Sequence, residues 1–228
     1  GRTGGFVLEV GADVDADERG LGELAAHENL HRLNGHRIRF ADDDAYTTLW
    51  FKEGVTEYLA VLESVRAGLV DEQRFFAMIA RSITNYLGNP AAAETGTAAL
   101  GERFWRDHDV QRLPYDKGAL LGLLIDLRLR TEGVGTLSGF LAALREDVAA
   151  QTLPLRSAAI RDALARYSGL PWSDFWRAHV DGSAPLPVFE ALDAIGLDVV
   201  ERIRPAPYFG FRASVDADGR WTLTDVGA

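Results

Sequence analysis

Apolar residues recur at helical spacing along most of the chain. In residues 21–33, leucines and alanines approximate one face of a helix, and Asn34-Gly35 then forms a typical helix stop. Further helices are predicted over residues 47–68, 71–88, 116–130, 138–150, 155–169, 171–182 and 187–196. The expected caps are Thr47 or Thr48, Asp71 and Ser138, with Pro171 in a first turn. Residues 116–130 are apolar on most sides, which predicts a helix at the centre of the fold.

Both ends of the chain have the pattern of β-strands. Residues 5–10, "GFVLEV", read as a short strand, and the C-terminal part favours strands that form a hairpin turning at Asp216 to Gly219. The sequence therefore predicts a mainly helical domain over residues 1–196 and a β tail over 197–228. The abrupt opening in a strand predicts that the chain is a piece of a longer protein.

Composition narrows the classes of function. Of the 228 residues, 47% are hydrophobic and 25% are charged, which is typical of a folded globular protein. The formal net charge of −10 disfavours a nonspecific nucleic-acid surface or an anionic-membrane surface. No apolar run reaches the roughly 18 residues of a membrane helix. Because the chain has no cysteine, a transition-metal site would have to use His, Asp and Glu.

The stretch "HENLH" carries a metal-site pattern. His27 and His31 stand four residues apart, so both imidazoles lie on one helix face and can bind one zinc ion. Glu28 is turned away from the ligand positions but can act as a general base on a water molecule. The alternative reading is a helix that carries surface histidines.

A catalytic zinc site needs a third protein ligand, and "LWFKEGVTEY" offers Glu53. Gly54 follows it, and a glycine inside a helix costs about 1 kcal/mol relative to alanine. That cost is easier to understand if another backbone or a substrate approaches there. Glu57 lies one turn after Glu53 and can accept a hydrogen bond from the free ring nitrogen of a ligating histidine. The alternative is a pair of exposed acids.

Three segments together resemble a known family. "HENLH", "LWFKEGVTEYLA" and "LPYDKGALLGLLIDLRLR" are similar, in this order, to successive motifs of the glycyl aminopeptidases, zinc metallopeptidases with a thermolysin-like catalytic domain. Asn34 with "HRIR" after the first motif, and Trp105, agree as well. The resemblance spans residues 21–130.

The resemblance implies the chemistry of a site. It assigns His27, His31 and Glu53 as zinc ligands, Glu28 as general base and proton shuttle, and Tyr115 as donor to the developing oxyanion. It further implies a thermolysin-like lobe with a small β remnant at the N-terminus, and a C-terminal tail that begins a PDZ-like β domain. The expected reaction is zinc-dependent hydrolysis of peptides with a small N-terminal residue, Gly or Ala.

Some positions leave alternatives open. Glu9 would contact the substrate if residues 5–10 line the cleft, but Val10 stands where the family has a histidine, so endopeptidase action of the same fold remains an alternative. His108 is a second candidate donor or a surface histidine, and His36 falls beyond the helix stop. Two other functions compete with peptidase activity: a non-catalytic peptide-binding module, and a structural helical domain with a coincidental motif.

Overall fold

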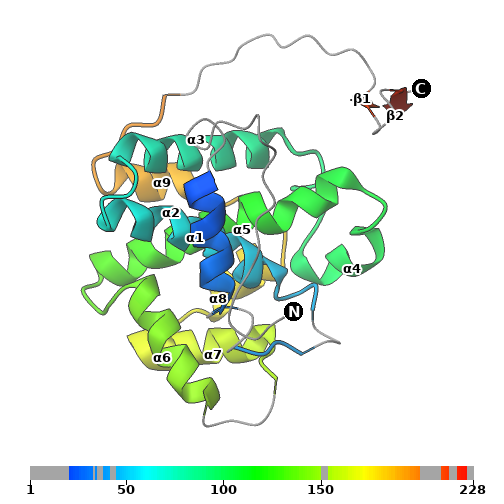
Figure 1. Cartoon of the computed structure of the whole chain (residues 1–228). Helices are drawn as coiled ribbons and strands as arrows, with labels where there is room; N and C mark the ends of the chain where they lie inside the picture. The colour runs from blue at the N-terminus through cyan, green and yellow to red at the C-terminus, as the bar shows by residue number, and fades with distance from the viewer. Residues whose placement is uncertain are drawn as a thin grey trace. The chain divides into compact units, whose positions relative to one another are not determined.

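Helices account for most of the secondary structure in the part of the chain that the computed structural model describes: residues 21–32, 34, 38–41, 45–149, 154–200, 212–215 and 220–224. They are α1 (Leu21–His31), η3 (Trp50–Val55), α2 (Thr56–Arg66), α3 (Glu72–Gly88), η4 (Thr97–Ala99), α4 (Leu100–Arg103), α5 (His108–Thr131), α6 (Leu137–Ala149), α7 (Ser157–Ser168), α8 (Ser173–Phe175), η5 (Trp176–Val180) and α9 (Val188–Asp193) (Figure 1). The mainly helical fold predicted from the sequence is confirmed.

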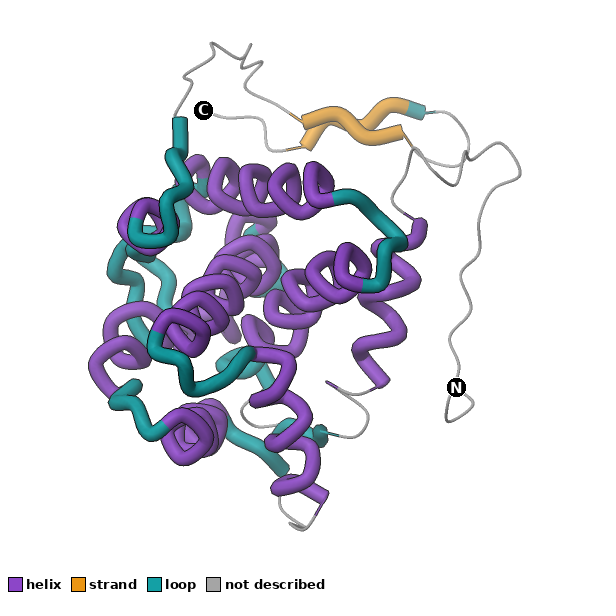
Figure 2. Tube along the Cα trace, turned by 90° about the vertical axis from the view of Figure 1, so that its left-hand side faces the viewer, coloured by secondary structure: helices purple, strands orange, loops and turns teal. Residues whose placement is uncertain are grey.

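The chain divides into two compact units, Gly1–Ala191 and Leu192–Ala228. In the first unit the helices run in several directions and cross one another (Figure 2). None of the helices in the described ranges combines the length and the apolar character that crossing a membrane requires.

Helix α5 is the central element of the larger unit and packs against η3, α2, α3 and α6. It begins at His108, so the predicted start at residue 116 is wrong. The side chain of Asp107 accepts hydrogen bonds from the backbone of Asp109 and Val110 and caps the helix. Pro114 lies inside the helix and removes one backbone donor there. The cap and the packing outweigh the proline, so Tyr115 is a residue within the helix and not at its start.

The segment predicted as one helix over residues 47–68 has two parts. Residues Trp50–Val55 form the π-helical turns of η3, and α2 continues from Thr56. Leu49, not Thr47 or Thr48, stands at the N-cap position, and it makes no side-chain cap. The wider π turns place Glu53 in an irregular segment, a kind of segment that is frequent at functional sites.

Other predicted boundaries are correct or shifted by a few residues. Asp71 caps α3 through Arg74 N–H, as predicted. Thr136 and not Ser138 caps α6, because its hydroxyl accepts from Gly139 N–H at 3.0 Å, whereas Ser138 donates to Glu63. Pro171 precedes α8 by two residues instead of lying in its first turn.

The second unit contains the predicted hairpin. Strands β1 (Arg212–Val215) and β2 (Trp221–Thr224) pair antiparallel, with Val215 opposite Trp221. The turn at 216–219 and the predicted N-terminal strand at 5–10 lie outside the described residues. The start of a PDZ-like domain therefore stays a prediction.

Candidate metal centre

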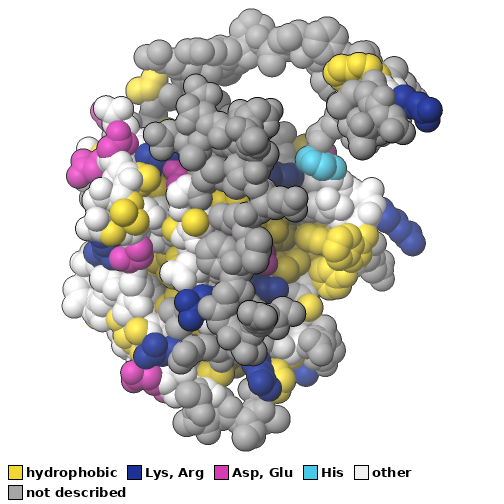
Figure 3. Space-filling model, viewed as in Figure 1, with side chains coloured by type: hydrophobic (Ala, Val, Ile, Leu, Met, Phe, Trp, Pro, Cys, Tyr) yellow, Lys and Arg dark blue, Asp and Glu magenta, His cyan; other side chains and the backbone are white. Residues whose placement is uncertain are grey.

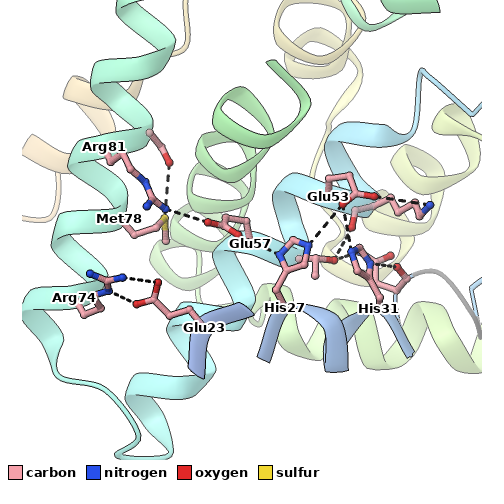
Figure 4. Close-up of polar contacts among 12 residues, drawn as sticks. Glu23, His27, His31, Glu53, Glu57, Arg74, Met78 and Arg81 are labelled. Atoms are coloured by element: carbon pink, nitrogen blue, oxygen red, sulfur yellow. Dashed lines mark hydrogen bonds and ion pairs between the residues drawn. The ribbon is translucent and has the colours of Figure 1, made fainter. Parts of the chain in front are cut away.

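Two helices bring three side chains to one point. His27 and His31 lie side by side on α1, with ring centroids 4.6 Å apart. The Oε2 atom of Glu53, from η3, lies 3.6 Å from Nε2 of His27 and 3.3 Å from Nε2 of His31. In Figure 4 both rings and the Glu53 carboxylate point toward one another. The three residues could each offer one ligand atom, all within 4.8 Å of one another.

A buried amide holds α1 against η3. The side-chain nitrogen of Asn34 donates to the carbonyl of Phe51 at 2.8 Å and to the hydroxyl of Thr56 at 3.0 Å. Asn34 is fully buried, and its backbone carbonyl oxygen lies 3.4 Å from Nδ1 of His31. Asn34 thus ties the histidine helix to the glutamate segment, a role that its reading as a helix stop did not predict.

The histidines are partnered on both ring nitrogens. Nδ1 of His27 lies 3.1 Å from Oε2 of Glu57, on α2. In the neutral ring, an N–H donor at Nδ1 leaves the lone pair on Nε2, and this arrangement orients a metal-ligating histidine.

The local electrostatics favour positive charge at this point. Burial alone would lower the pKa of His27, but hydrogen bonds with Glu53 and Glu57 outweigh it and raise that pKa to about 9. For Glu53, burial would raise the pKa, yet hydrogen bonds with His27 and His31 lower it to about 2. The cluster therefore stabilises a cation between the imidazoles and the carboxylate, whether a proton or a metal ion.

The donor set fits zinc. Zinc binds imidazole nitrogen and carboxylate oxygen at about 2.0–2.2 Å in tetrahedral sites, which separates neighbouring donors by about 3.3–3.6 Å. The two Glu53 distances, 3.3 and 3.6 Å, match this spacing before any adjustment of the side chains. Three protein ligands leave a fourth position open, as catalytic zinc sites do.

Two of the three metal-site residues, His27 and Glu53, line a cavity of about 410 Å³. Its walls are formed by Glu23, Leu24, His27, Glu28, Glu53, Glu57, Arg74, Arg81 and Tyr115. Burial, and then the negative charge of Glu53, raise the pKa of Tyr115; Glu28 adds to this, while Arg112 opposes it. The phenol therefore stays protonated at neutral pH and can donate a hydrogen bond.

The backbones of η3 and α5 touch beside the cavity. A Cβ atom on Gly54 would lie 2.5 Å from the carbonyl oxygen of Pro114 and closer still to the backbone of Gly118. A Cβ on Gly118 would in turn lie 2.5 Å from the carbonyl oxygen of Trp50. Another backbone does approach at Gly54, as its cost inside a helix predicted. This crossing joins the segment that carries Glu53 to the helix that carries Tyr115.

The remaining candidates lie either away from this arrangement or outside the described residues. His108 is an exposed residue at the start of α5, with Nδ1 4.0 Å from an oxygen of Asp109, and it does not line the cavity. Trp105 is 75% exposed and donates to the hydroxyl of Tyr46; hydrophobic side chains gather over this region near α4 in Figure 3. Glu9 and His36 lie outside the described residues.

The cavity also contains residues that the sequence did not single out. Arg74 and Arg81 reach it from α3, and Glu23 and Leu24 reach it from α1. A spacing of seven residues puts the two arginines on one face of the predicted helix. That signal could have grouped them, but it does not show which element they face.

Comparison with known proteins gives one family match and one fold match. Residues 21–121 match the profile of the M61 glycyl aminopeptidase family. Among solved structures, an aminopeptidase N family protein from Idiomarina loihiensis superposes with a TM-score of 0.73 at 19% sequence identity. The match covers 95% of this chain but 42% of that chain, so this chain spans about two fifths of its length. At this identity the likeness establishes the fold alone. No curated protein matches significantly.

Proposed function

We propose that this chain, whose residues 21–121 match the M61 glycyl aminopeptidase family model, is a peptidase of that family and hydrolyses peptide bonds with the help of a zinc ion. One observation carries the proposal. The Glu53 carboxylate lies at zinc-ligand spacing from both His27 and His31. Glu28 and Tyr115 line the same cavity as His27 and Glu53. Metal binding alone needs neither Glu28 nor Tyr115, whereas hydrolysis uses Glu28 as a base and Tyr115 as a hydrogen-bond donor.

In the proposed mechanism, the metal ligands and Glu28 have different roles. The two histidines and Glu53 would hold the zinc ion, which would supply Lewis-acid polarisation of the scissile carbonyl and a lowered pKa for a water molecule. Glu28 accepts the proton of the attacking water and delivers it to the leaving amine. Glu28 suits this task because it projects from α1 beside His27 and lines the cavity without being one of the clustered donors.

Tyr115 acts at the carbonyl oxygen. Its raised pKa keeps the hydroxyl protonated, so it can donate to negative charge that develops on the substrate. The charge of Glu53, a proposed metal ligand, is among the causes that raise the pKa of Tyr115, so the hydroxyl lies within electrostatic reach of that ligand. Since α5 is anchored at the Gly54 crossing, the tyrosine and the ligand glutamate are held in one fixed relation.

We propose that the substrates are peptides with a small N-terminal residue, Gly or Ala, a preference that rests on the family. An endopeptidase of the same fold is the alternative within this chemistry. A non-catalytic peptide-binding module is the alternative outside it, and the presence of Glu28 and Tyr115 in the cavity speaks against that role.

Hydrolysis of matched peptides tests the substrate class. With zinc bound, the chain is expected to cleave Gly- and Ala-initiated peptides and to lose at least about tenfold in kcat/KM when the N-terminus is acetylated, since an aminopeptidase binds the free amine. A tenfold change corresponds to about 1.4 kcal/mol of binding to that amine. Equal cleavage of free and acetylated peptides would establish endopeptidase action, and cleavage of neither would contradict the proposed function.

A further inference from the structure

The carboxylate of Glu57 bridges two cationic side chains from different helices. Its Oε2 atom lies 3.1 Å from Nδ1 of His27 on α1, and its Oε1 atom accepts from Nη2 of Arg81 on α3 at 3.1 Å. The close-up shows a continuous chain of contacts from Arg81 through Glu57 to His27 (Figure 4). Each carboxylate oxygen thus has its own partner.

The contact with Arg81 prevents a rotation of the Glu57 carboxylate that the contact with His27 alone allows. A carboxylate held at one oxygen can still turn about its terminal bond, and its acceptor lone pair then leaves the imidazole N–H. With Arg81 on the other oxygen, the plane of the Glu57 carboxylate is fixed from both sides. The orientation of the His27 ring, and with it the direction of Nε2, depends on that plane.

The position of Arg81 relative to Glu57 is set by the packing of α3. Ile79, Ser82 and Ile83 around it are buried, so the register of α3 against its neighbours is set by packing. Arg81 has a side chain that is 53% exposed, while Glu57 is 29% exposed. The arginine therefore contributes little to the core, and its substitution can be made without opening a cavity.

The positive charge of Arg81 also compensates negative charge in the cavity. Four carboxylates line the cavity, on Glu23, Glu28, Glu53 and Glu57, with two arginines among them. Arg81 offsets the charge of Glu57, and Arg112 also acts on that carboxylate.

We infer that Arg81 is a positioning residue for the metal ligand His27 and acts through Glu57. The inference rests on the proposed metal site, because it assigns Arg81 a role toward a metal that His27 binds. Arg81 touches neither the reacting atoms nor the metal-ligand atoms. It fixes the direction in which one ligand presents its lone pair.

Arg74 provides a matched control on the same helix. It lies seven residues before Arg81, lines the same cavity and pairs with Glu23, with Nη2 3.0 Å from Oε2. Within the described part of the chain, Glu23 pairs with Arg74 and makes no hydrogen bond or ion pair with His27 or His31. Arg74→Met therefore removes the same charge from the same cavity without breaking the contacts that lead to His27.

The test measures zinc affinity by chelator competition in the 228-residue chain. We expect Arg81→Met to weaken zinc binding by about tenfold, the lower end of the effect of losing a residue that orients a metal ligand. Arg81→Lys, which keeps a cation near Oε1, should recover part of the loss, and Arg74→Met should stay within about twofold of the parent. The visible spectrum of the cobalt-substituted chain should change in Arg81→Met and not in Arg74→Met, because only the former disturbs ligand geometry.

The outcomes separate the two proposals. If the parent binds no zinc, the proposed function fails. If the parent binds zinc and Arg81→Met binds it equally well with an unchanged cobalt spectrum, the metal site stands and the role of Arg81 is wrong. Equal losses in Arg81→Met and Arg74→Met would also overturn the inference, because a general effect of cavity charge would then explain both.

Discussion

Replacing Glu28 with glutamine is expected to lower kcat/KM for peptide hydrolysis by about a thousandfold while zinc stays bound. The amide keeps the shape of the side chain but cannot accept the proton of the attacking water. His27, His31 and Glu53 are untouched, so the metal-ligand atoms remain. Kinetics on a Gly- or Ala-initiated peptide, with zinc content measured on the same sample, check both parts.

Two further variants sharpen this result. Tyr115→Phe should lose less than Glu28→Gln and also retain zinc, because it removes one donor to the oxyanion and no proton carrier. Glu146→Gln serves as a matched control, since that glutamate is 77% exposed and does not line the cavity. Parent-like turnover in Glu28→Gln would contradict the mechanism. Loss of zinc in Tyr115→Phe would show that the tyrosine has a different role.

Replacing Gly54 with alanine is expected to lower the free energy of unfolding by about 3 kcal/mol. The added methyl group would overlap the backbone of Gly118 and the carbonyl of Pro114, and backbone cannot move aside as a flexible side chain can. Relief requires η3 to separate from α5, which moves Glu53 away from Tyr115. Chemical denaturation measures the stability, and zinc affinity at low denaturant reports the displaced ligand.

Gly22→Ala is the control for helix propensity. Gly22 lies in α1, and a Cβ there would meet nothing within 4 Å. The substitution should be neutral or stabilise by up to about 1 kcal/mol, as alanine does in an open helix position. If Gly54→Ala is as stable as Gly22→Ala, the backbone crossing does not hold the site together.

The sequence predicts the grouping of His27, His31 and Glu53 better than it predicts the boundaries of the helices around them. The spacing of His27 and His31 determines their geometry locally, because residues four apart on a helix always share a face. Glu53 is predicted as the third ligand because it carries a carboxylate and because a glycine follows it inside a helix. The approach of a backbone to Gly54 could be expected, although the sequence did not show that Gly118 supplies it.

The wrong predictions concern features that depend on contacts between distant residues or on two opposing local signals. The start of α5 at His108 depends on the cap at Asp107 outweighing Pro114, and both signals lie within a few residues of one another. The capping of α6 by Thr136 leaves Ser138 free to donate to Glu63, which is distant in sequence. The contacts of Arg81 and Asn34 likewise join separate elements, so no local pattern reveals them.

The position of zinc in crystals tests the central claim most directly. Diffraction data collected on both sides of the zinc absorption edge, from crystals of the chain with one equivalent of zinc, locate the ion independently of any activity. The account predicts one anomalous peak, about 2.0–2.2 Å from Nε2 of His27, Nε2 of His31 and the carboxylate of Glu53. No peak at these three atoms, or a zinc ion bound elsewhere on the chain, would contradict it.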